Sequence, residues 1–451
     1  MTTPQQPDFK NFLISPPVRS AIAAQSAYAP QPIPVIITLV EAKDGIDQGV
    51  AQAKSQVKAF LESKGYKVRE SDYYLFASLR PADIRDLATQ RTLVHRIWKD
   101  EITYTHLLDS TTTIKAAAGW RSFDARGKGI CWAVLDTGIR SDHPHFKNIL
   151  KPDLDKNLSN SLTLDDRNGH GSHVAGIIAG ASQPKADSTP YKAATYLEEQ
   201  DDANIVTLDG CPSGVAPLTT LINVKVLEDD GTGSASNAIL GLEYVRKLNA
   251  NSRKIVVDGV NMSLGYPFDP KWYGCGHSPL CDEVQRAVDS GIIVVISCGN
   301  SGYGTATLDT GEQVPTWLSN SITDPANAKD AIAVGSVHKS QPHTYGVSYF
   351  SSKGPTGDGR HKPDIVAPGE KVISCSIHSD QGYEYEERSG TSMAAPHVSG
   401  AIAAFLSVHP EYRGDPASVK DIFLKNAIDL GRTIDFQGCG MVDLMRAIMS
   451  V

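Results

Sequence analysis

The sequence predicts an α/β protein in which a small α+β domain precedes a three-layer domain with a mostly parallel sheet. From about residue 107 onward, short runs that are apolar throughout alternate with helical stretches. This alternation is typical of parallel strands that are buried on both faces and joined by crossover helices. Over residues 34–106, strand-like and helix-like segments alternate on a smaller scale, which indicates a separate, compact α+β unit.

The composition excludes several classes of function. Of the 451 residues, 41% are hydrophobic and 21% are charged, as in ordinary soluble globular proteins. The net charge is −8 and no dense Lys/Arg run occurs, so neither nucleic acid nor an anionic membrane is expected as a partner. No segment has the roughly 20 consecutive apolar residues that span a bilayer.

The first two segments of the chain differ in pattern. Residues 1–33 are rich in Pro, Gln, Ala and Ser without a clear period, and we expect a loosely ordered N-terminal extension. The compact unit of residues 34–106 has apolar residues at helical spacing, namely Val50, Ala53, Val57, Phe60 and Leu61. Its expected order is a strand over 34–40, a helix that ends at Gly65, a strand over about 68–79, a helix over about 81–89 and a strand over 93–98.

Residues 107–451 carry the larger domain. Strands are expected in the apolar runs over 130–135, 220–226, 255–261, 292–296 and 331–334, with crossover helices over 237–248 and 281–290. Residues 181–214 are polar and irregular, which indicates an insertion. Parallel sheets bind ligands beyond the carboxyl ends of their strands, so the residues that follow these runs are the first candidates for a site.

Two segments bring candidate side chains to the ends of elements. Asp136 ends the buried run of the Asp-Thr-Gly block; taken alone, such a carboxylate is more often a cap or turn residue. His170 lies between two glycines at the start of a helix, and His173 follows three residues later. A two-histidine metal site is an alternative, but it lacks a third ligand at helical spacing.

The third segment is Ser-Gly-Thr-Ser-Met-Ala-Ala-Pro-His-Val over residues 389–398. Pro396 is tolerated only near the start of a helix, which puts Ser392 at the N-terminus. An N-cap serine is the simpler interpretation. The sharper one is a nucleophile at the positive end of the helix.

Together the three blocks resemble the subtilisin-like serine proteases (subtilases) in residue type and in the order Asp, His, Ser. The resemblance covers about residues 107–451 and implies a subtilisin-like peptidase domain. In that role Ser392 would attack the scissile carbonyl, His170 would accept and return the proton, and Asp136 would orient His170. Asn300 lies in the segment over 294–302, which matches the end of the family's oxyanion-hole strand, so it would stabilise the oxyanion. No cofactor is implied.

The resemblance also implies a peptide or protein substrate that pairs with the chain through its backbone. Two segments match the family's substrate strands. Their residues are Gly231, Thr232 and Gly233 in the first, and Ser263, Leu264 and Gly265 in the second. Because backbone pairing ignores side chains, broad endopeptidase activity is the expectation. By the same resemblance, the insertion between residues 303 and 323 would lie near the primary specificity pocket, so no preferred side chain is assigned.

The unit over residues 34–106 is similar in pattern and placement to the ferredoxin-like propeptides of this family. It would act as an intramolecular chaperone and inhibitor, with the tail over 102–108 passing through the active site. The chain would then be a self-inhibited zymogen. The alternatives are a catalytically silent, propeptide-locked scaffold or binding protein, and the serine-carboxyl peptidases, which share Ser-Gly-Thr-Ser but use acidic residues where this chain has His170.

One departure from the family pattern concerns calcium. Many subtilases have His-Pro-Asp after the first block, whereas this chain has His145 in place of the aspartate. Imidazole is a poor ligand for Ca²⁺, so no metal site is assigned. Asp165, Asp166, Asp201 and Asp202 are interpreted as solvated loop charges.

The cysteines and the N-terminus bear on location. Seven Cys are present, and Cys275 and Cys281 lie six residues apart in a Gly/Pro loop, where we expect two free thiols rather than a disulfide or metal pair. The N-terminus lacks the features of a secretory signal. Both observations predict a cytoplasmic protein.

Overall fold

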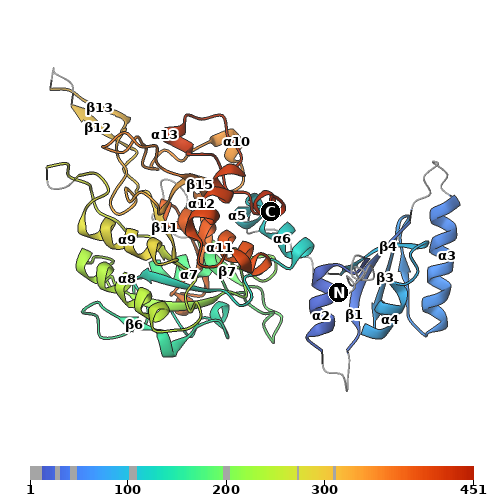
Figure 1. Cartoon of the computed structure of the whole chain (residues 1–451). Coiled ribbons are helices and arrows are strands. Elements are labelled where there is room, and N and C mark those ends of the chain that lie inside the picture. Colours follow the sequence, from blue (N-terminus) through green and yellow to red (C-terminus); the bar gives the residue numbers. More distant parts are fainter. Residues whose placement is uncertain are drawn as a thin grey trace, which may run out of the picture. The chain divides into compact units, whose positions relative to one another are not determined.

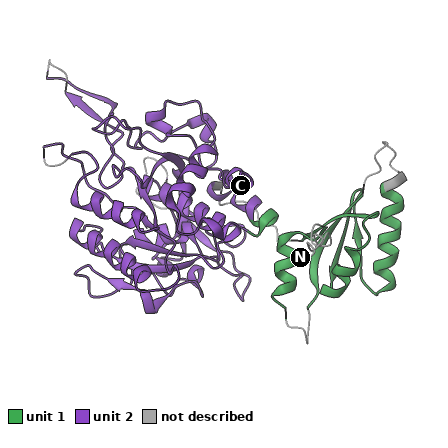
Figure 2. Ribbon diagram, viewed as in Figure 1, with its two compact units in different colours: residues 1–103, 120–124 green, residues 104–119, 125–451 purple. Residues whose placement is uncertain are grey.

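The computed structural model describes residues 13–25, 31–40, 48–100, 109–196, 204–271, 274–307 and 311–451. The chain divides into two compact units, one of residues 1–103 and 120–124 and the other of residues 104–119 and 125–451 (Figure 2). Helix α5 (Asp109–Thr113) belongs to the second unit, and the boundary after residue 119 falls within α6 (Ala116–Phe123).

The first unit is a four-stranded antiparallel sheet in the order β2-β3-β1-β4, with helices packed on it (Figure 1). Its elements are α2 (Pro16–Ala23), β1 (Ile33–Leu39), α3 (Gln48–Ser63), β2 (Arg69–Glu70), β3 (Tyr74–Leu79), α4 (Pro81–Leu87) and β4 (Val94–Lys99). The expected α+β domain is confirmed. The single strand expected over 68–79 is instead two strands, since residues 71–73 form a turn between β2 and β3.

The expectation of a loosely ordered extension is wrong for part of residues 1–33. Helix α2 lies there, and its Val18 is fully buried in the core of the first unit. Ile14 is buried beside it and forms a bridge with Ile97 of β4. Leu13, Ala21 and Ile22 pack against the same core, and the N–H of Ser15 donates to the carbonyl of Ile97 at 2.9 Å, so this segment is part of the first unit.

The second unit is built on a seven-stranded parallel sheet in the order β15-β14-β11-β10-β5-β9-β6. Its strands are β5 (Cys131–Asp136), β6 (Lys156–Asn157), β9 (Thr220–Lys225), β10 (Gly259–Met262), β11 (Ile293–Ser297), β14 (Ile332–His338) and β15 (Ile365–Glu370). Every residue of β5, β10 and β11 is buried, which is why their sequences are mostly apolar.

Helices cover both faces of this sheet and make the predicted three layers (Figure 1). On one face, α8 (Ala235–Ala250) and α9 (Pro279–Asp289) pack on the odd-numbered residues of β5 in one core cluster. On the other, α7 (His170–Ile178) and the long helix α11 (Thr391–Val408) pack against each other and the sheet. The expected fold class is confirmed.

The remaining elements lie outside the main sheet. The polar insertion contains β7 (Lys192–Thr195) and β8 (Asn204–Thr207), which join β16 (Val372–Cys375) and β17 (Tyr385–Arg388) in a small sheet. Strands β12 (Tyr303–Thr307) and β13 (Gln313–Trp317) form a hairpin. The short helices are η1 (Pro144–Phe146), η2 (Pro152–Leu154), α10 (Pro342–Tyr345), η3 (Ser379–Gln381), η4 (Pro410–Tyr412), α12 (Pro416–Lys425), α13 (Ile434–Gln437) and α14 (Leu444–Met449).

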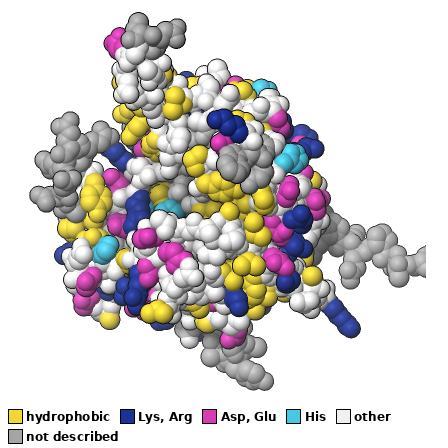
Figure 3. Space-filling view, turned by 90° about the vertical axis from the view of Figure 1, so that its left-hand side faces the viewer, with side chains coloured by type: hydrophobic (Ala, Val, Ile, Leu, Met, Phe, Trp, Pro, Cys, Tyr) yellow, Lys and Arg dark blue, Asp and Glu magenta, His cyan; other side chains and the backbone are white. Residues whose placement is uncertain are grey.

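The surface in Figure 3 carries interspersed acidic and basic side chains rather than a field of one sign. Of the described helices, α11 is long and apolar enough to cross a membrane by length and composition. Its apolar window is 83% buried in the protein, so it is the core helix of the second unit.

Candidate active site

The candidate residues come together at one edge of the parallel sheet. Asp136 is the last residue of β5, Ser263 follows β10, and Asn300 follows β11. Parallel strands end at the same edge, where the N-termini of α7 and α11 bring His170 and Ser392. A cleft of about 620 Å³ is lined by His170, Ser392 and Asn300, and also by residues 231–233 and 263–265.

Asp136 and His170 form a direct pair. Nδ1 of His170 lies 2.7 Å from Oδ1 of Asp136, and the same carboxylate oxygen accepts the N–H of Thr137 at 2.8 Å. Asp136 is 1% exposed, whereas the His170 side chain is 23% exposed. Since Nδ1 donates to the carboxylate, Nε2 of neutral His170 is the acceptor nitrogen.

The pKa of His170 reflects competing effects. Burial by itself lowers it, but the charge of Asp136 and the hydrogen bond to that carboxylate outweigh burial. The net result is a pKa above the ordinary histidine value. The imidazolium form is therefore favoured by its buried partner, as a group that must take up a proton requires.

Ser392 is the second residue of α11 and is bound to the end of β10. Its Oγ donates to the carbonyl of Ser263 at 3.3 Å, and Oγ of Ser263 donates to the carbonyl of Ser392 at 2.9 Å. Pro396 explains why that second carbonyl is available, because proline has no N–H to bond the residue four positions earlier. In the described part of the chain, Ser392 thus bonds Ser263 rather than His170.

Asn300 has a fixed orientation. Its Oδ1 accepts both the N–H and the hydroxyl of Thr391 at 2.9 Å. A backbone N–H requires an acceptor, so this contact assigns the oxygen and leaves the Nδ2 amide as donor. The N–H of Ser392, in the first turn of α11, also lacks an intrahelical partner. The cleft therefore has a side-chain donor and a backbone donor close to the same serine.

The two expected substrate segments differ in their own bonding. The carbonyl of Thr232 accepts the N–H of Glu228, and Asp230 accepts both donors of Thr232. Leu264 and Gly265 make no backbone hydrogen bond within the described residues. Their amide and carbonyl groups are therefore available to a bound strand.

Asp166 is not the solvated loop charge that the sequence predicts. It is 1% exposed and accepts the backbone N–H groups of Asn168, Gly169 and Ser172. It thus satisfies free donors at the N-terminus of α7. An aspartate four residues before a Gly-flanked histidine is a capping signal that could have identified it. Asp165 is exposed as expected.

Asp201 and Asp202 lie outside the described residues. Among the described residues, no group of three His, Cys, Asp or Glu side chains is arranged to hold a metal. His173 is bound to β16 and β17, with Nε2 near the carbonyls of Val372 and Glu386 at 3.2 and 3.1 Å. All seven cysteines, including Cys275 and Cys281, are free.

Comparison with known proteins gives the family. The model of the subtilase family matches residues 127–442. The chain is 33% identical to the major intracellular serine protease of Bacillus subtilis over 321 residues, covering 70% of this chain and 80% of that protein. It is 31% identical to serine protease AprX of the same organism over 71% of this chain and 66% of AprX.

Subtilisin E of Bacillus subtilis is 29% identical over 403 residues, covering 88% of this chain and 87% of that protein. This match is longer than the second unit, so it includes part of the first. The family model and the intracellular relative both identify the family, and the candidate residues lie together at one edge of the sheet. The chain belongs to the subtilase family and is a serine endopeptidase of that class.

Proposed function

We propose that this chain hydrolyses peptide bonds through Asp136, His170 and Ser392 by way of an acyl-enzyme intermediate. The Asp136–His170 hydrogen bond at 2.7 Å is the observation that carries the proposal. Nε2 of His170 takes the proton of Ser392 as Oγ attacks the scissile carbonyl, and then gives it to the leaving amine. A water molecule then attacks the acyl-enzyme by the same proton transfers, which releases the acyl group. Asp136 holds the tautomer and stabilises the imidazolium.

The attack requires Oγ of Ser392 to leave the carbonyl of Ser263. That hydrogen bond is long at 3.3 Å. A modest rotation of the Ser392 side chain therefore exchanges the carbonyl of Ser263 for Nε2 of His170 as the acceptor. Hydrogen bonds of catalytic groups often tighten only when substrate is bound. The developing oxyanion takes hydrogen bonds from Nδ2 of Asn300 and the N–H of Ser392.

An extended peptide is the proposed substrate. Its backbone would pair with Leu264 and Gly265 on one segment, and on the other it would lie against residues 231–233, where the N–H and carbonyl of Thr232 are already bonded within the turn. All of these residues line the cleft that contains Ser392. Backbone pairing selects an extended conformation rather than a sequence, which supports broad endopeptidase activity.

We further propose an inhibitor domain over 34–106, to whose sheet helix α2 of the 1–33 segment is packed, and a peptidase domain over 107–451. The match to subtilisin E extends into the inhibitor domain. In this domain Ile36, Phe76 and Trp98 are paired across one face of the sheet, opposite its core, and are only partly buried. Such an apolar face suits docking on the peptidase domain of the same chain. The expected tail over 102–108 lies outside the described residues.

A cytoplasmic location is proposed on two grounds. The seven cysteines are free and five are buried, which suits a reducing compartment. One relative is named as an intracellular protease. Cell fractionation should find the protein with cytosolic markers, and recovery from the culture medium would contradict this.

The triad is tested with Ser392→Ala. In subtilisin, loss of the corresponding serine lowers kcat by about 10⁶, and we expect a loss of that size on a tetrapeptide p-nitroanilide. A fluorophosphonate probe should label the wild-type chain and not Ser392→Ala. Circular dichroism checks that the variant folds. A wild-type chain that neither turns over nor reacts with the probe would instead be the catalytically silent scaffold.

A further inference from the structure

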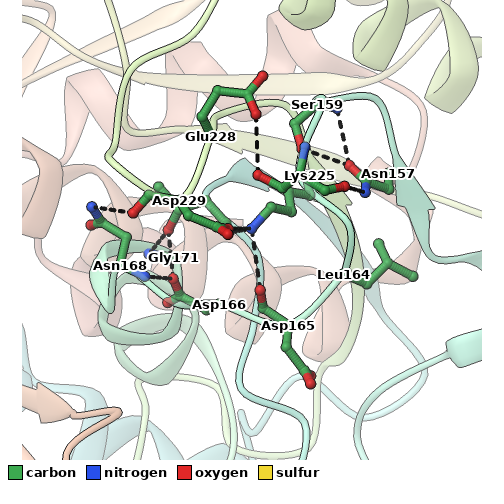
Figure 4. A network of polar contacts seen from close by, with 12 residues as sticks. Asn157, Ser159, Leu164, Asp165, Asp166, Asn168, Gly171, Lys225, Glu228 and Asp229 are labelled. Atoms are coloured by element: carbon green, nitrogen blue, oxygen red, sulfur yellow. Dashed lines mark hydrogen bonds and ion pairs between the residues drawn. The ribbon is translucent and has the colours of Figure 1, made fainter.

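Asp166 forms hydrogen bonds to the segments that carry Asp136 and His170, the two residues of the proposed acid–base pair. Its Oδ1 accepts the hydroxyl of Thr137 at 2.9 Å and the N–H of Gly169 at 2.8 Å. Its Oδ2 accepts the N–H of Ser172 at 2.8 Å. The carboxylate lies at the start of α7 (Figure 4). It therefore fixes the turn that begins with His170.

Thr137 carries this constraint to the carboxylate of the pair. It directly follows Asp136 and donates its N–H to Oδ1 of that residue at 2.8 Å. Its hydroxyl donates to Asp166 and accepts the N–H of Gly171 at 2.9 Å. One hydroxyl thus connects the end of β5, the buried carboxylate of Asp166 and the first turn of α7.

Lys225 holds the same region from β9. Its ammonium group is fully buried and donates to the carbonyls of Thr137 at 2.6 Å and Asp165 at 3.2 Å. It also pairs with Asp229 at 2.7 Å (Figure 4). The loop that carries Asp166 is therefore bound at the backbone of the preceding residue, so its carboxylate has little freedom to move.

Several charged groups face His170. Asp136 approaches from β5, and Asp166 from the loop before α7. Arg388 of β17 approaches with the opposite charge, within 3.5 Å of the carbonyl of Asn168, and is paired with Glu386 at 2.8 Å. Asp136 and Asp166 both favour the protonated form of His170, the charge of Asp136 more strongly.

We propose that Asp166 is a positioning residue that sets the geometry of the Asp136–His170 pair through Thr137 and the first turn of α7. This inference rests on the function proposed above. Asp166 does not touch the substrate cleft, since it is absent from the residues that line it. A displacement of about 1 Å at such a pair costs about 10²-fold in rate. A substitution of Asp166 that shifts Asp136 or His170 should therefore lower the rate measurably.

The first test compares Asp166→Asn with the matched control Asp165→Asn, which changes the exposed neighbour. On the tetrapeptide p-nitroanilide we expect kcat of Asp166→Asn to fall about 10–100-fold with KM unchanged. The acid limb of kcat/KM should also move to lower pH, because a negative charge facing His170 is lost. Asp165→Asn should stay within about twofold of the wild type. Equal kcat and pH profiles for all three proteins would overturn the proposal.

The second test does not depend on turnover. In full-length Ser392→Ala protein, the proton between His170 Nδ1 and Asp136 should give a low-field NMR resonance, assigned by its loss in His170→Gln. Adding Asp166→Asn should shift or broaden this resonance, and adding Asp165→Asn should not. If the wild-type chain proves inactive, the proposed function fails, yet this resonance still reports whether Asp166 sets the pair. An unchanged resonance would overturn the role of Asp166.

Thr137 provides a milder variant in case Asp166→Asn does not fold. Thr137→Val removes only the hydroxyl that links Asp166 to Gly171, whereas Thr137→Ser keeps it. The positioning role predicts a lower kcat and a shifted resonance for Thr137→Val and a recovery of both in Thr137→Ser. Equal behaviour of the two variants would contradict it.

Discussion

Asn300 is held by its carbonyl oxygen, and this determines what its other end can do. Thr391 supplies two donors to Oδ1 at 2.9 Å, and Thr391 itself precedes Ser392. The amide of Asn300 is thus fixed relative to the proposed nucleophile before any substrate arrives. Preorganised donors of this kind contribute to catalysis because they need no reorientation in the transition state.

We therefore expect Asn300→Ala to lower kcat with little change in KM. Removal of one oxyanion-hole donor from subtilisin costs about 10²–10³ in kcat, and a loss of that size is expected here. Steady-state kinetics on the tetrapeptide p-nitroanilide provide the measurement. A variant with raised KM and unchanged kcat would assign Asn300 to substrate binding instead.

The Asp136–His170 pair leads to a prediction about pH. His170 must be neutral to accept a proton, and its pKa is raised above the ordinary value of about 6.5 because Asp136 outweighs burial. The acid limb of kcat/KM should therefore lie above pH 6.5 in the wild type. In Asp136→Asn it should move to lower pH, while kcat falls by about 10⁴ as in other triads. An acid limb that stays in place would show that another group controls it.

At the scale of elements, the site depends on how helix α7 is attached at its two ends. Asp166 satisfies donors at its N-terminus. Near its C-terminus, Nε2 of His145 lies 3.1 Å from the carbonyls of Gly176 and Ala179, and Nδ1 lies 3.1 Å from the hydroxyl of Tyr385. Burial lowers the pKa of His145 to about 3. A neutral imidazole thus binds η1 to α7 and β17.

This attachment leads us to expect little dependence on calcium. His145 stands where many family members have an aspartate, and it meets its neighbours through hydrogen bonds rather than as an oxygen ligand. The melting temperature of full-length Ser392→Ala protein should change by no more than about 3 °C between excess calcium and EGTA. A much larger drop on chelation would show that other oxygen atoms form a calcium site.

For the whole molecule, the proposed zymogen predicts a defined cut. A tail bound as product next to Ser392 would be cleaved near residues 106–109, most readily after Leu107 or Leu108. Wild-type protein should then yield a fragment of about 37 kDa from the 48.5 kDa chain. The Ser392→Ala chain should stay whole. Intact-mass measurement and N-terminal sequencing give the site.

The same prediction has a direct control. Adding the separate fragment 1–106 to the processed enzyme should inhibit it, because the partly buried face with Ile36, Phe76 and Trp98 would dock again. Wild-type protein that is active and uncut, and that does not change when residues 1–106 are deleted, would refute the inhibitor role. Those residues would then form an accessory domain.

Much of the fold could be predicted because its signals are local. The apolar runs of β5 and β11 and the helical spacing in α3 arise from the period of each element. The positions of His170 and Ser392 follow from helix-start chemistry, namely a flanking glycine and Pro396. The run over 255–261 shows the limit: only Gly259–Met262 pairs as a strand. The side chain of Asn249 instead accepts the N–H groups of Val256 and Val257 and donates to the carbonyl of Val257.

The sequence by itself determined the fold class, the family and the three residues that we propose for the triad. Only the tertiary structure decided which charges are buried. Lysine and aspartate usually lie on the surface. Lys225 and Asp166 are nevertheless buried, because segments distant in sequence cover them and supply hydrogen bonds. The reciprocal bonds of Ser263 and Ser392 likewise join residues 129 positions apart. Local patterns carry the periodicity of each element, whereas the desolvation and pairing of a polar group depend on which distant segments fold against it.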